Sequence, residues 1–271
     1  MIQFDQNTCI HCGRCAYDCF PHAITMENGA PVLAAPGSCI GCGHCIAICP
    51  VEAVRDPALP GDDIAPVCPA GDPKALLSRM RSRRSCRHYK ENAPVTEQEL
   101  SLLLSAARAC PTAKNLQGTR YIAVRESIPQ LLDAALEGLG LVGQDQLRTA
   151  ADPGELRRAN NFIAWAKTRE TDKTFDPLFF HAPLLLMFVA DKSDPRDAAG
   201  AAAYTELMAA QLGLGCLYSG YFTACAAGSP KIRELLHLKD NEQVVRCLVL
   251  GHPDVKFPRT APRRPVDLTT M

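Results

Sequence analysis

Net charge is the first property that this sequence lacks. Its 271 residues include 29 Lys and Arg and 29 Asp and Glu. A balanced chain has no general attraction for nucleic acid or for an anionic membrane, so we expect neither as a partner. The N-terminal residues, MIQFDQNTC, also lack a charged stretch that leads into an apolar run, and we therefore expect no secretory signal.

Residues 207–228 carry no charge and are long enough to cross a bilayer. They are rich in small residues, however, and they are interrupted by Gln211 and by Gly213, Gly215 and Gly220. We therefore expect a buried helix followed by a strand and a turn, with no membrane span.

Cysteine, in contrast, is abundant. Eight of the 14 cysteines lie in the first 50 residues, in two groups that repeat at an offset of 30 residues. Each group has the spacing C-x2-C-x2-C-x3-C that is typical of bacterial ferredoxins. The first group is Cys9, Cys12, Cys15 and Cys19, and the second is Cys39, Cys42, Cys45 and Cys49.

This spacing predicts two [4Fe–4S] clusters. Three cysteines spaced by two residues wrap around one face of a cubane, whereas the fourth cannot turn back and binds the other cluster. Zinc is the alternative, because C-x2-C pairs also bind zinc, but zinc needs neither the third cysteine nor the repeated fourth one. The segment resembles two-cluster ferredoxins. Cluster one is assigned to Cys9, Cys12, Cys15 and Cys49, and cluster two to Cys39, Cys42, Cys45 and Cys19.

Residues 56–73 hold five prolines, two glycines and four aspartates. This composition interrupts helices and strands, so we predict a linker between a cluster-binding domain at 1–55 and a second domain at 74–271. Cys68, inside the linker, is interpreted as an incidental small residue. The other scattered cysteines are interpreted as small apolar fillers: Cys86, Cys110, Cys216, Cys225 and Cys247.

The second domain alternates helical and extended patterns, which predicts an α+β fold with helices around a sheet. Thr96 and Glu99 have the spacing of a capping box and predict the start of a helix. Helices are predicted at 74–82, 96–110, 128–139, 153–169, 195–212 and 230–238, and strands at 119–125, 183–190 and 243–250.

Three segments of this domain carry groups suited to ligand binding. Residues 83–89, RRSCRHY, place several guanidinium groups beside a hydroxyl, and arginine forks match phosphate oxygens. Residues 110–118, CPTAKNLQG, form a polar loop between a helix and a strand. Residues 213–220, GLGCLYSG, are followed downstream by GHP at 251–253 and by a basic tail at 259–264. Taken singly, each has an ordinary explanation as an exposed basic run or a connecting loop.

In this order the segments resemble the nitroreductase family of FMN-dependent oxidoreductases, over about residues 76–265. The family signature is an RRSxR segment, a helix, a P-S/T-x-x-N-x-Q loop, a strand, a GLG segment and a GxP strand end with a basic tail. With the cysteine repeat in front, the chain resembles ferredoxin–nitroreductase fusion proteins. The resemblance implies that the chain binds FMN in addition to the two clusters. It also implies a nitroreductase-like mixed sheet flanked by helices, and a homodimer with FMN at the subunit interface.

The resemblance also implies which residues contact FMN on the phosphate side. Arg83, Arg84 and Ser85 are expected to hold the phosphate and the ribityl chain. Arg263, helped by Arg264, is expected to close on the phosphate from the basic tail.

On the ring side, Arg87 is expected to face the N1/O2 edge, where a cation stabilises the anionic reduced flavin. This sequence has Gly118 where the loop usually continues with proline, and Ser219 where some relatives carry an acid, which leaves the substrate class open. The other expected ring contacts are Pro111, Thr112 and Asn115 of the partner subunit, and Leu217, Tyr218, Ser219 and Gly220 near N5.

We therefore expect electrons to enter singly at the clusters from a ferredoxin-like donor, to be paired on FMN, and to leave to a small organic acceptor such as a nitro compound, an activated alkene or a quinone. Two alternatives stay open. The chain could be a non-catalytic carrier or redox sensor that relays electrons to a partner protein. NAD(P)H could also reduce the flavin directly, although no GxGxxG stretch argues for a dedicated Rossmann site. No side chain is expected to act as a nucleophile. Oxygen-labile clusters and the lack of an export signal predict a cytoplasmic protein.

Overall fold

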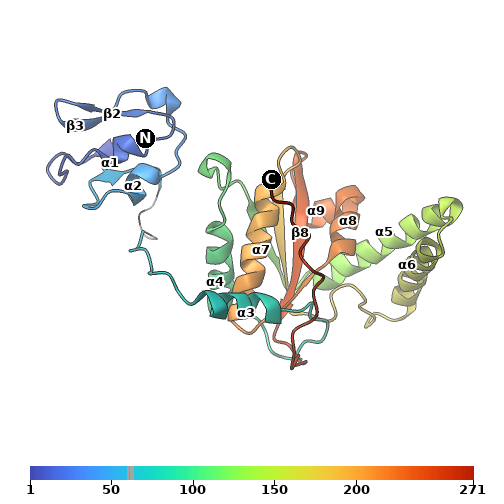
Figure 1. Ribbon diagram of the computed structural model, residues 1–271. Coiled ribbons are helices and arrows are strands. Elements are labelled where there is room, and N and C mark those ends of the chain that lie inside the picture. Colours follow the sequence, from blue (N-terminus) through green and yellow to red (C-terminus); the bar gives the residue numbers. More distant parts are fainter. Residues whose placement is uncertain (60, 62–63) are drawn as a thin grey trace. The chain divides into compact units, whose positions relative to one another are not determined.

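The computed structural model describes residues 1–59, 61 and 64–271. Residues 60, 62 and 63 of the predicted linker lie outside the described residues. The chain divides into two compact units, which are Met1–Gly71 with Pro111–Gln117, and Asp72–Cys110 with Gly118–Met271. Figure 1 labels elements of both units where there is room.

The first unit contains one small motif twice. In each copy a glycine with left-handed backbone, Gly13 (φ 72°) or Gly43 (φ 77°), precedes a one-turn helix, α1 (Arg14–Tyr17) or α2 (His44–Ala47). A side chain with a Cβ is strained at such φ angles, so glycine is favoured where the chain turns into each helix. The two copies fold alike because their glycines and cysteines recur at the same spacing.

Short strands complete this unit. β1 (Gln3–Phe4) pairs antiparallel with β4 (Val54–Arg55), and β2 (Ile24–Glu27) forms an antiparallel hairpin with β3 (Ala30–Leu33). A short 3-10 helix, η1 (Pro36–Ser38), precedes the second cysteine group. The small apolar core consists of Ile2, Cys15, Ile24, Cys45 and Val54.

The second unit is built on a four-stranded sheet in the order β5-β6-β8-β7, in which every neighbouring pair is antiparallel. The strands are β5 (Arg120–Val124), β6 (Leu184–Asp191), β7 (Gly215–Tyr218) and β8 (Glu242–Gly251). Ser85 adds a parallel bridge to Cys216 of β7, so the sheet becomes mixed at this edge.

β6 is buried on both faces. Leu185 and Met187 belong to one apolar cluster, Leu186 and Phe188 belong to the other, and all four side chains are fully buried. Because successive residues of a strand face opposite sides, a strand between two layers of helices is apolar throughout. Helices α5 (Ile128–Thr149), α8 (Gly220–Gly228) and α9 (Pro230–Leu235) contribute to the first cluster, and α4 (Glu97–Arg108) and α7 (Arg196–Gln211) to the second (Figure 1).

The predicted elements are present, with two differences. Thr96 and Glu99 form the expected capping box at α4, and every predicted strand is found within about a residue of its expected ends. α5 runs on to Thr149 instead of ending at 139, because α6 (Pro153–Thr171) packs along it. Residues 207–228 include a second helix, α8, where a turn was expected. Among the described residues, the helices are all too short or too polar to span a membrane.

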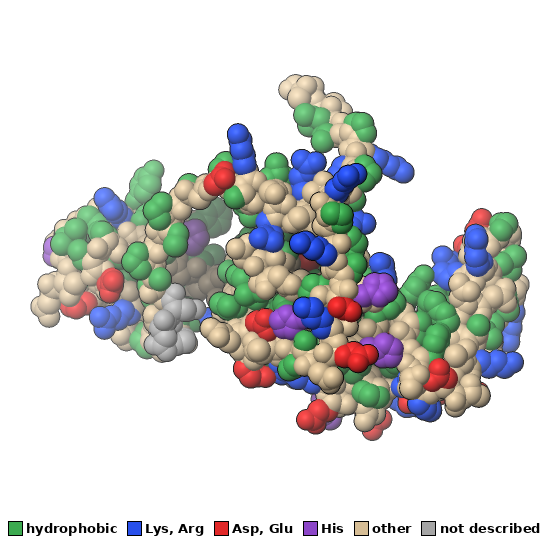
Figure 2. Space-filling model, turned by 90° about the horizontal axis from the view of Figure 1, so that it is seen from below, with side chains coloured by type: hydrophobic (Ala, Val, Ile, Leu, Met, Phe, Trp, Pro, Cys, Tyr) green, Lys and Arg blue, Asp and Glu red, His purple; other side chains and the backbone are tan. Residues whose placement is uncertain are grey.

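The α5–α6 hairpin depends on glycines that let the helices approach. Residues 138–143 read GLGLVG, a nucleotide-binding pattern only where a strand meets a helix, whereas here they lie inside α5. A Cβ added to Gly140 would lie 2.8 Å from Cβ of Ala166, and one added to Gly143 would lie 2.6 Å from the carbonyl oxygen of Ala159. The glycine pattern therefore serves helix packing. Figure 2 shows apolar side chains exposed on this hairpin.

Three aromatic side chains connect α6 to α8. Phe162 and Trp165 of α6 lie with ring centroids 5.1 Å and 6.1 Å from Tyr221 of α8, and 5.8 Å from each other. Edge-to-face and tilted ring pairs at such distances are favourable beyond the area that they bury. The cluster fixes α6 beside the start of α8.

We expect Gly143→Ala and Gly138→Ala, both in α5, to have opposite effects on stability. The alanine methyl at 143 would overlap a backbone oxygen of α6 and lower the free energy of unfolding by about 1–3 kcal/mol. A Cβ at Gly138 meets no atom within 4 Å, so the better helix propensity of alanine should raise it by about 0.5–1 kcal/mol. Urea unfolding followed by circular dichroism measures both. Equal shifts of the two variants would contradict the packing role of Gly143.

Candidate functional site

The cysteines of the first unit are available as ligands. All eight are free thiols, with Cys15 in α1 and Cys45 in α2. Backbone amides already point at two of the sulfurs. The His11 N–H donates to Cys9 Sγ at 3.4 Å, and the Ala53 N–H donates to Cys49 Sγ at 3.2 Å. Such hydrogen bonds to sulfur tune the reduction potential of iron–sulfur clusters.

The electrostatics of these thiols show which ones lie together. Burial raises the pKa of Cys45 to about 11, and the neighbouring Cys42, Cys39 and Cys15 raise it as well. Burial also raises the pKa of Cys15, with smaller contributions from Cys9 and Cys12. Crowded, buried thiols do not ionise unaided, whereas a metal centre supplies the missing positive charge. The donor set therefore fits a thiolate-bound cluster.

No three His, Cys, Asp or Glu side chains in the described part of the chain converge closely enough to hold a single metal ion. A cubane spreads its four thiolates over four irons, which is a different arrangement.

In the second unit, the arginine segment is fixed beside the sheet by backbone hydrogen bonds. The Cys86 N–H donates to the Cys216 carbonyl at 3.0 Å, and the Lys90 N–H donates to the His252 carbonyl at 2.8 Å. The Asp254 N–H donates back to the His88 carbonyl at 2.9 Å. The structure thus brings together three segments that the sequence singled out: RRSCRHY, GLGCLYSG and GHP.

The buried Tyr89 hydroxyl strengthens this attachment. Its oxygen lies 3.0 Å from the carbonyl oxygen of Cys86 and 3.1 Å from that of Val249, so its single hydrogen is shared between the two acceptors. Burial raises its pKa far above the usual value, so this hydroxyl stays a donor at any physiological pH.

Glycines make room for the segment at both of its attachments. A Cβ on Gly215 would lie 2.6 Å from Cys86 Sγ, and one on Gly251 would lie 2.8 Å from Cδ1 of Tyr89. Gly213 has a different task, because its left-handed backbone (φ 77°) ends α7 and turns the chain into β7. In the GLG segment, Gly213 therefore allows the turn, and Gly215 allows the close approach of Cys86.

Arg83 is held by a buried acid. Its Nη1 lies 2.8 Å from Oε1 of Glu206 in α7, and the Glu206 side chain is only 11% exposed. Tyr218 of β7 lies close enough to this carboxylate to act toward lowering its pKa. Burial raises the pKa of Glu206, while the Arg83 charge acts to lower it. One carboxylate thus connects the arginine segment with the strand that precedes α8.

Arg87 leaves the same segment on its exposed side, and its guanidinium carbon lies 6.0 Å from the ring centroid of Phe180. Arg84 and Ser85 are exposed. Ser85 and Arg87 therefore lie on the backbone stretch that is fixed to the sheet, and Arg83 and Arg84 directly precede it, an arrangement that suits an anionic ligand.

The segment Leu217–Gly220 lies where β7 meets α8. Ser219 is buried, and its N–H donates to the Cys247 carbonyl at 2.9 Å. Gly220 opens α8, and a Cβ there would meet no atom within 4 Å. The helix start therefore borders open space at Gly220.

The remaining predicted residues lie in exposed loops. Thr112 shapes the loop Pro111–Gln117, because its Oγ1 accepts from the Gln117 N–H at 3.1 Å and its carbonyl from the Asn115 N–H at 3.0 Å. Arg263 and Arg264 are exposed in the C-terminal segment.

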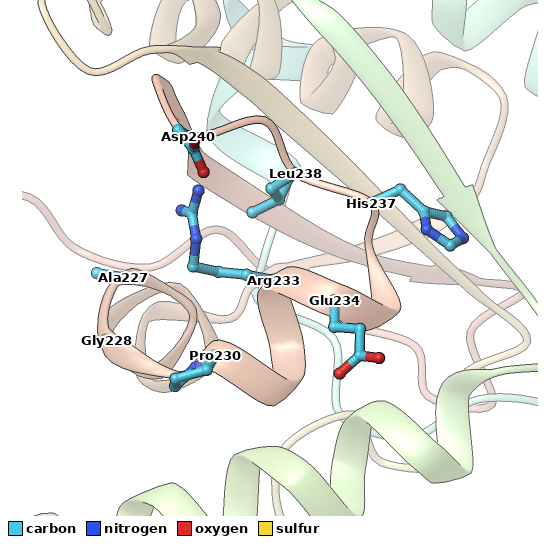
Figure 3. A pocket seen from close by; sticks show the side chains of 8 residues that line it. All are labelled: Ala227, Gly228, Pro230, Arg233, Glu234, His237, Leu238 and Asp240. Carbon is cyan, nitrogen blue, oxygen red and sulfur yellow. The ribbon is translucent and has the colours of Figure 1, made fainter.

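A surface pocket of about 520 Å³ lies between α8, α9 and the loop that precedes β8 (Figure 3). Arg233 lines it but is occupied, since it donates to the carbonyls of Glu242 at 3.0 Å and Lys239 at 2.7 Å. The pocket contains none of the predicted site residues. It is lined by Ala227, Gly228, Pro230, Arg233, Glu234, His237, Leu238 and Asp240.

Family comparisons agree with both halves of the sequence. Residues 80–252 match the nitroreductase family, and residues 1–50 match a 4Fe–4S dicluster domain. The first match spans more than half of the chain, and the chain therefore belongs to the nitroreductase family. This confirms the expected combination of a ferredoxin-like segment with a nitroreductase-family domain. The search of curated proteins found no match.

Solved structures share the fold of the second unit. A nitroreductase with bound FMN from Bacteroides fragilis is 19% identical, with a TM-score of 0.51, over 72% of this chain and 98% of that one. A nitroreductase with bound FMN from Desulfitobacterium hafniense is 20% identical, with a TM-score of 0.51, over 72% and 98%. Iodotyrosine deiodinase bound to FMN and 3-iodo-L-tyrosine is 19% identical, with a TM-score of 0.51, over 72% and 97%. These likenesses confirm the α+β, nitroreductase-like fold.

Sequence reasoning missed Glu206 and Phe180. Glu206 lies in the Ala-rich helix α7, where an acid on the buried face is a detectable signal once the helix is placed. Phe180 looked like any other apolar residue before a buried strand, because its contact with Arg87 joins positions far apart in the chain.

We expect Arg83→Ala to lower the free energy of unfolding by about 1–3 kcal/mol, because it leaves the buried Glu206 carboxylate without its cation. The pKa of Glu206 should then rise further above that of the unfolded chain. A raised carboxyl pKa means that stability is lost as pH rises, so the penalty should be larger at pH 8 than at pH 5. Urea unfolding at the two pH values measures it.

The double variant Arg83→Ala/Glu206→Gln is the control. It has no carboxyl to titrate at this position, and its penalty should be the same at both pH values. A pH-dependent penalty that survives in the double variant would refute the role of this ion pair.

Proposed function

We propose that this chain is an iron–sulfur flavoprotein oxidoreductase that passes electrons from two [4Fe–4S] clusters through FMN to a small organic acceptor. The observation that carries the proposal is the fixed segment Ser85–Lys90, which gathers the arginine, GLG and GHP segments at one edge of the sheet. Membership of the nitroreductase family supports FMN as the ligand of this edge. The match to a dicluster domain supports the two clusters.

Bound FMN would supply the two-electron chemistry, and the clusters would supply single-electron transfer. Arg83, Arg84 and Ser85 hold the phosphate and ribityl chain in this proposal, and Arg263 and Arg264 close on the phosphate. The ion pair with Glu206 supports the role of Arg83, because its guanidinium is already oriented before any ligand binds.

On the ring side, Arg87 faces the N1/O2 edge, where its charge stabilises the anionic reduced ring. Leu217, Tyr218, Ser219 and Gly220 line the region near N5. The Ser219 N–H already donates to Cys247, whereas the first amides of a helix have no partner within the helix. We therefore propose the Gly220 N–H as the donor to N5.

In the first unit, the proposal keeps one cluster on Cys9, Cys12, Cys15 and Cys49, and the other on Cys39, Cys42, Cys45 and Cys19. The nearness of Cys9 and Cys12 to Cys15, and of Cys39 and Cys42 to Cys45, supports the three ligands that each run gives to its own cluster. Clusters of this kind need a reducing, oxygen-poor setting, so we also propose a cytoplasmic location. The domain limits stay as proposed, at 1–55 and 74–271.

The chain is proposed to form a homodimer in which Pro111, Thr112 and Asn115 reach the FMN of the other subunit. Every residue of α3 (Pro73–Ser82) is exposed, including Leu76 (56%) and Leu77 (53%). An amphipathic helix without a buried face suggests a partner surface. A second copy of this chain is the partner that completes the site.

The proposed electron path can be tested by anaerobic reduction of the reconstituted chain. We expect about eight irons and one FMN per chain, and reduction of the flavin by a one-electron donor such as reduced ferredoxin. Cys12→Ser should lower the iron content and slow this flavin reduction, with FMN still bound. Cys68→Ser, an exposed cysteine outside the two runs, is the matched control and should behave as the wild type.

Reoxidation separates the remaining possibilities. An enzyme transfers its electrons to one or more members of a panel of nitroaromatics, activated alkenes, quinones and halogenated rings. Reoxidation only by a partner protein would favour the carrier, and prompt bleaching of the flavin by NADH or NADPH would favour direct nicotinamide reduction. Equal rates of flavin reduction in Cys12→Ser and the wild type would refute the proposal that electrons reach the flavin through the clusters.

The proposed dimer predicts that Leu76→Glu/Leu77→Glu yields a monomer with weakened FMN binding, because charges would be buried in the interface. Size-exclusion chromatography with light scattering measures the mass. Val67→Glu, at a highly exposed apolar residue of the predicted linker, is the control and should leave a dimer. A wild-type monomer that carries FMN would disprove the shared site.

A further inference from the structure

A loop before β6 is organised by one carboxylate. Asp176 Oδ1 accepts from the N–H groups of Leu178, at 3.2 Å, and Phe179, at 2.8 Å. Its Oδ2 accepts from the N–H of His181 at 2.8 Å. Three amides on one side chain fix the path of the backbone through Phe180.

The backbone of this loop has an uncommon conformation. Phe180 (φ 56°) and His181 (φ 58°) are consecutive left-handed residues, a region that bulky side chains rarely adopt. Such conformations persist only where the surroundings hold them, and they occur preferentially at functional sites. Here the surroundings are the Asp176 carboxylate and the neighbouring Phe179. The Phe179 side chain is fully buried, with its ring centroid 5.3 Å from that of Phe222 in α8.

With Phe179 directed into the core, the Phe180 ring meets Arg87. The guanidinium carbon lies 6.0 Å from the ring centroid, at the range where a cation is attracted to an aromatic face. The backbone on both sides of Arg87 is fixed, by the Cys86 amide and the His88 carbonyl. Its long side chain is exposed, so its position depends on what it stacks against.

We propose that Phe180 is a positioning residue of the flavin site, which holds the Arg87 guanidinium in place and is itself held by Asp176. The inference rests on the proposed function of Arg87 at the N1/O2 edge of FMN. Arg87 touches the cofactor, and Phe180 acts through Arg87. The strained loop thus fixes in advance a charge that would otherwise have to be ordered when the flavin binds.

The alternative is that Phe180 only packs against the apolar core, where it is partly buried. Packing and positioning differ in what a substitution changes. A packing residue alters stability alone, whereas a positioning residue alters FMN affinity and flavin potential in a manner that requires Arg87.

The experiment uses the full chain with its clusters, stripped of FMN and titrated with FMN by flavin fluorescence. Phe180→Leu keeps an apolar side chain but removes the aromatic face, and should weaken FMN binding about threefold. The potential of the bound flavin should fall, because the cation near N1 is less well placed. Phe180→Tyr keeps the aromatic face and should match the wild type.

A double-mutant cycle with Arg87→Gln isolates the coupling. In that background Phe180→Leu should have no further effect on FMN affinity or potential. Asp176→Asn leaves Phe180 in the chain and should change both quantities in the same direction as Phe180→Leu, which covers the case in which Phe180→Leu does not fold.

The outcomes are distinguishable. If Arg87→Gln leaves FMN affinity and potential unchanged, the proposed role of Arg87 fails. If Arg87→Gln changes them but Phe180→Leu and Asp176→Asn do not, the positioning role alone is overturned. Equal effects of Phe180→Leu with and without Arg87 would also overturn it, because Phe180 would then act by itself.

Discussion

The second unit depends on the attachment of Ser85–Lys90 to the edge of its sheet. This segment is not one of the four strands, yet backbone hydrogen bonds to Cys216 and His252 align it with β7 and with the end of β8. Backbone bonds of this kind do not involve side chains, which leaves the Arg87 side chain of the segment available for a ligand. The attachment also requires Gly215 and Gly251, since a methyl group at either would displace the segment. The arginine, GLG and GHP segments, which lie far apart in the sequence, therefore meet at the same edge of the sheet.

Charge is the second constraint on this edge. Arg83, Arg84 and Arg87 place like charges close together in the chain, and an anionic ligand offsets them only once it has bound. Glu206 provides a counter-charge at Arg83 within the chain. Burying a carboxylate is unfavourable unless it is paired, so α7 and the arginine segment stabilise each other. The aromatic face of Phe180 attracts the Arg87 guanidinium, which keeps its full positive charge.

The sequence predicts whatever depends on local spacing. The Thr96–Glu99 capping box and the strand at 183–190 are set by neighbours within a few residues, and both appear in the structure as expected. The length of α5 was not predictable in this way, because its second half is held by α6 and not by its own residues. Glu206 and Phe180 were missed for the same reason. Their partners, Arg83 and Arg87, lie far away in the chain, and only the folded sheet brings them together.

The aromatic cluster of Phe162, Trp165 and Tyr221 contains the single tryptophan of the chain. Tyr221 follows Gly220 directly, so this indole lies close to the point where β7 turns into α8. Its fluorescence emission therefore reports on the contact between α6 and α8. Any movement of the α5–α6 hairpin away from α8 changes the surroundings of that one chromophore, and it can be followed in the unlabelled protein.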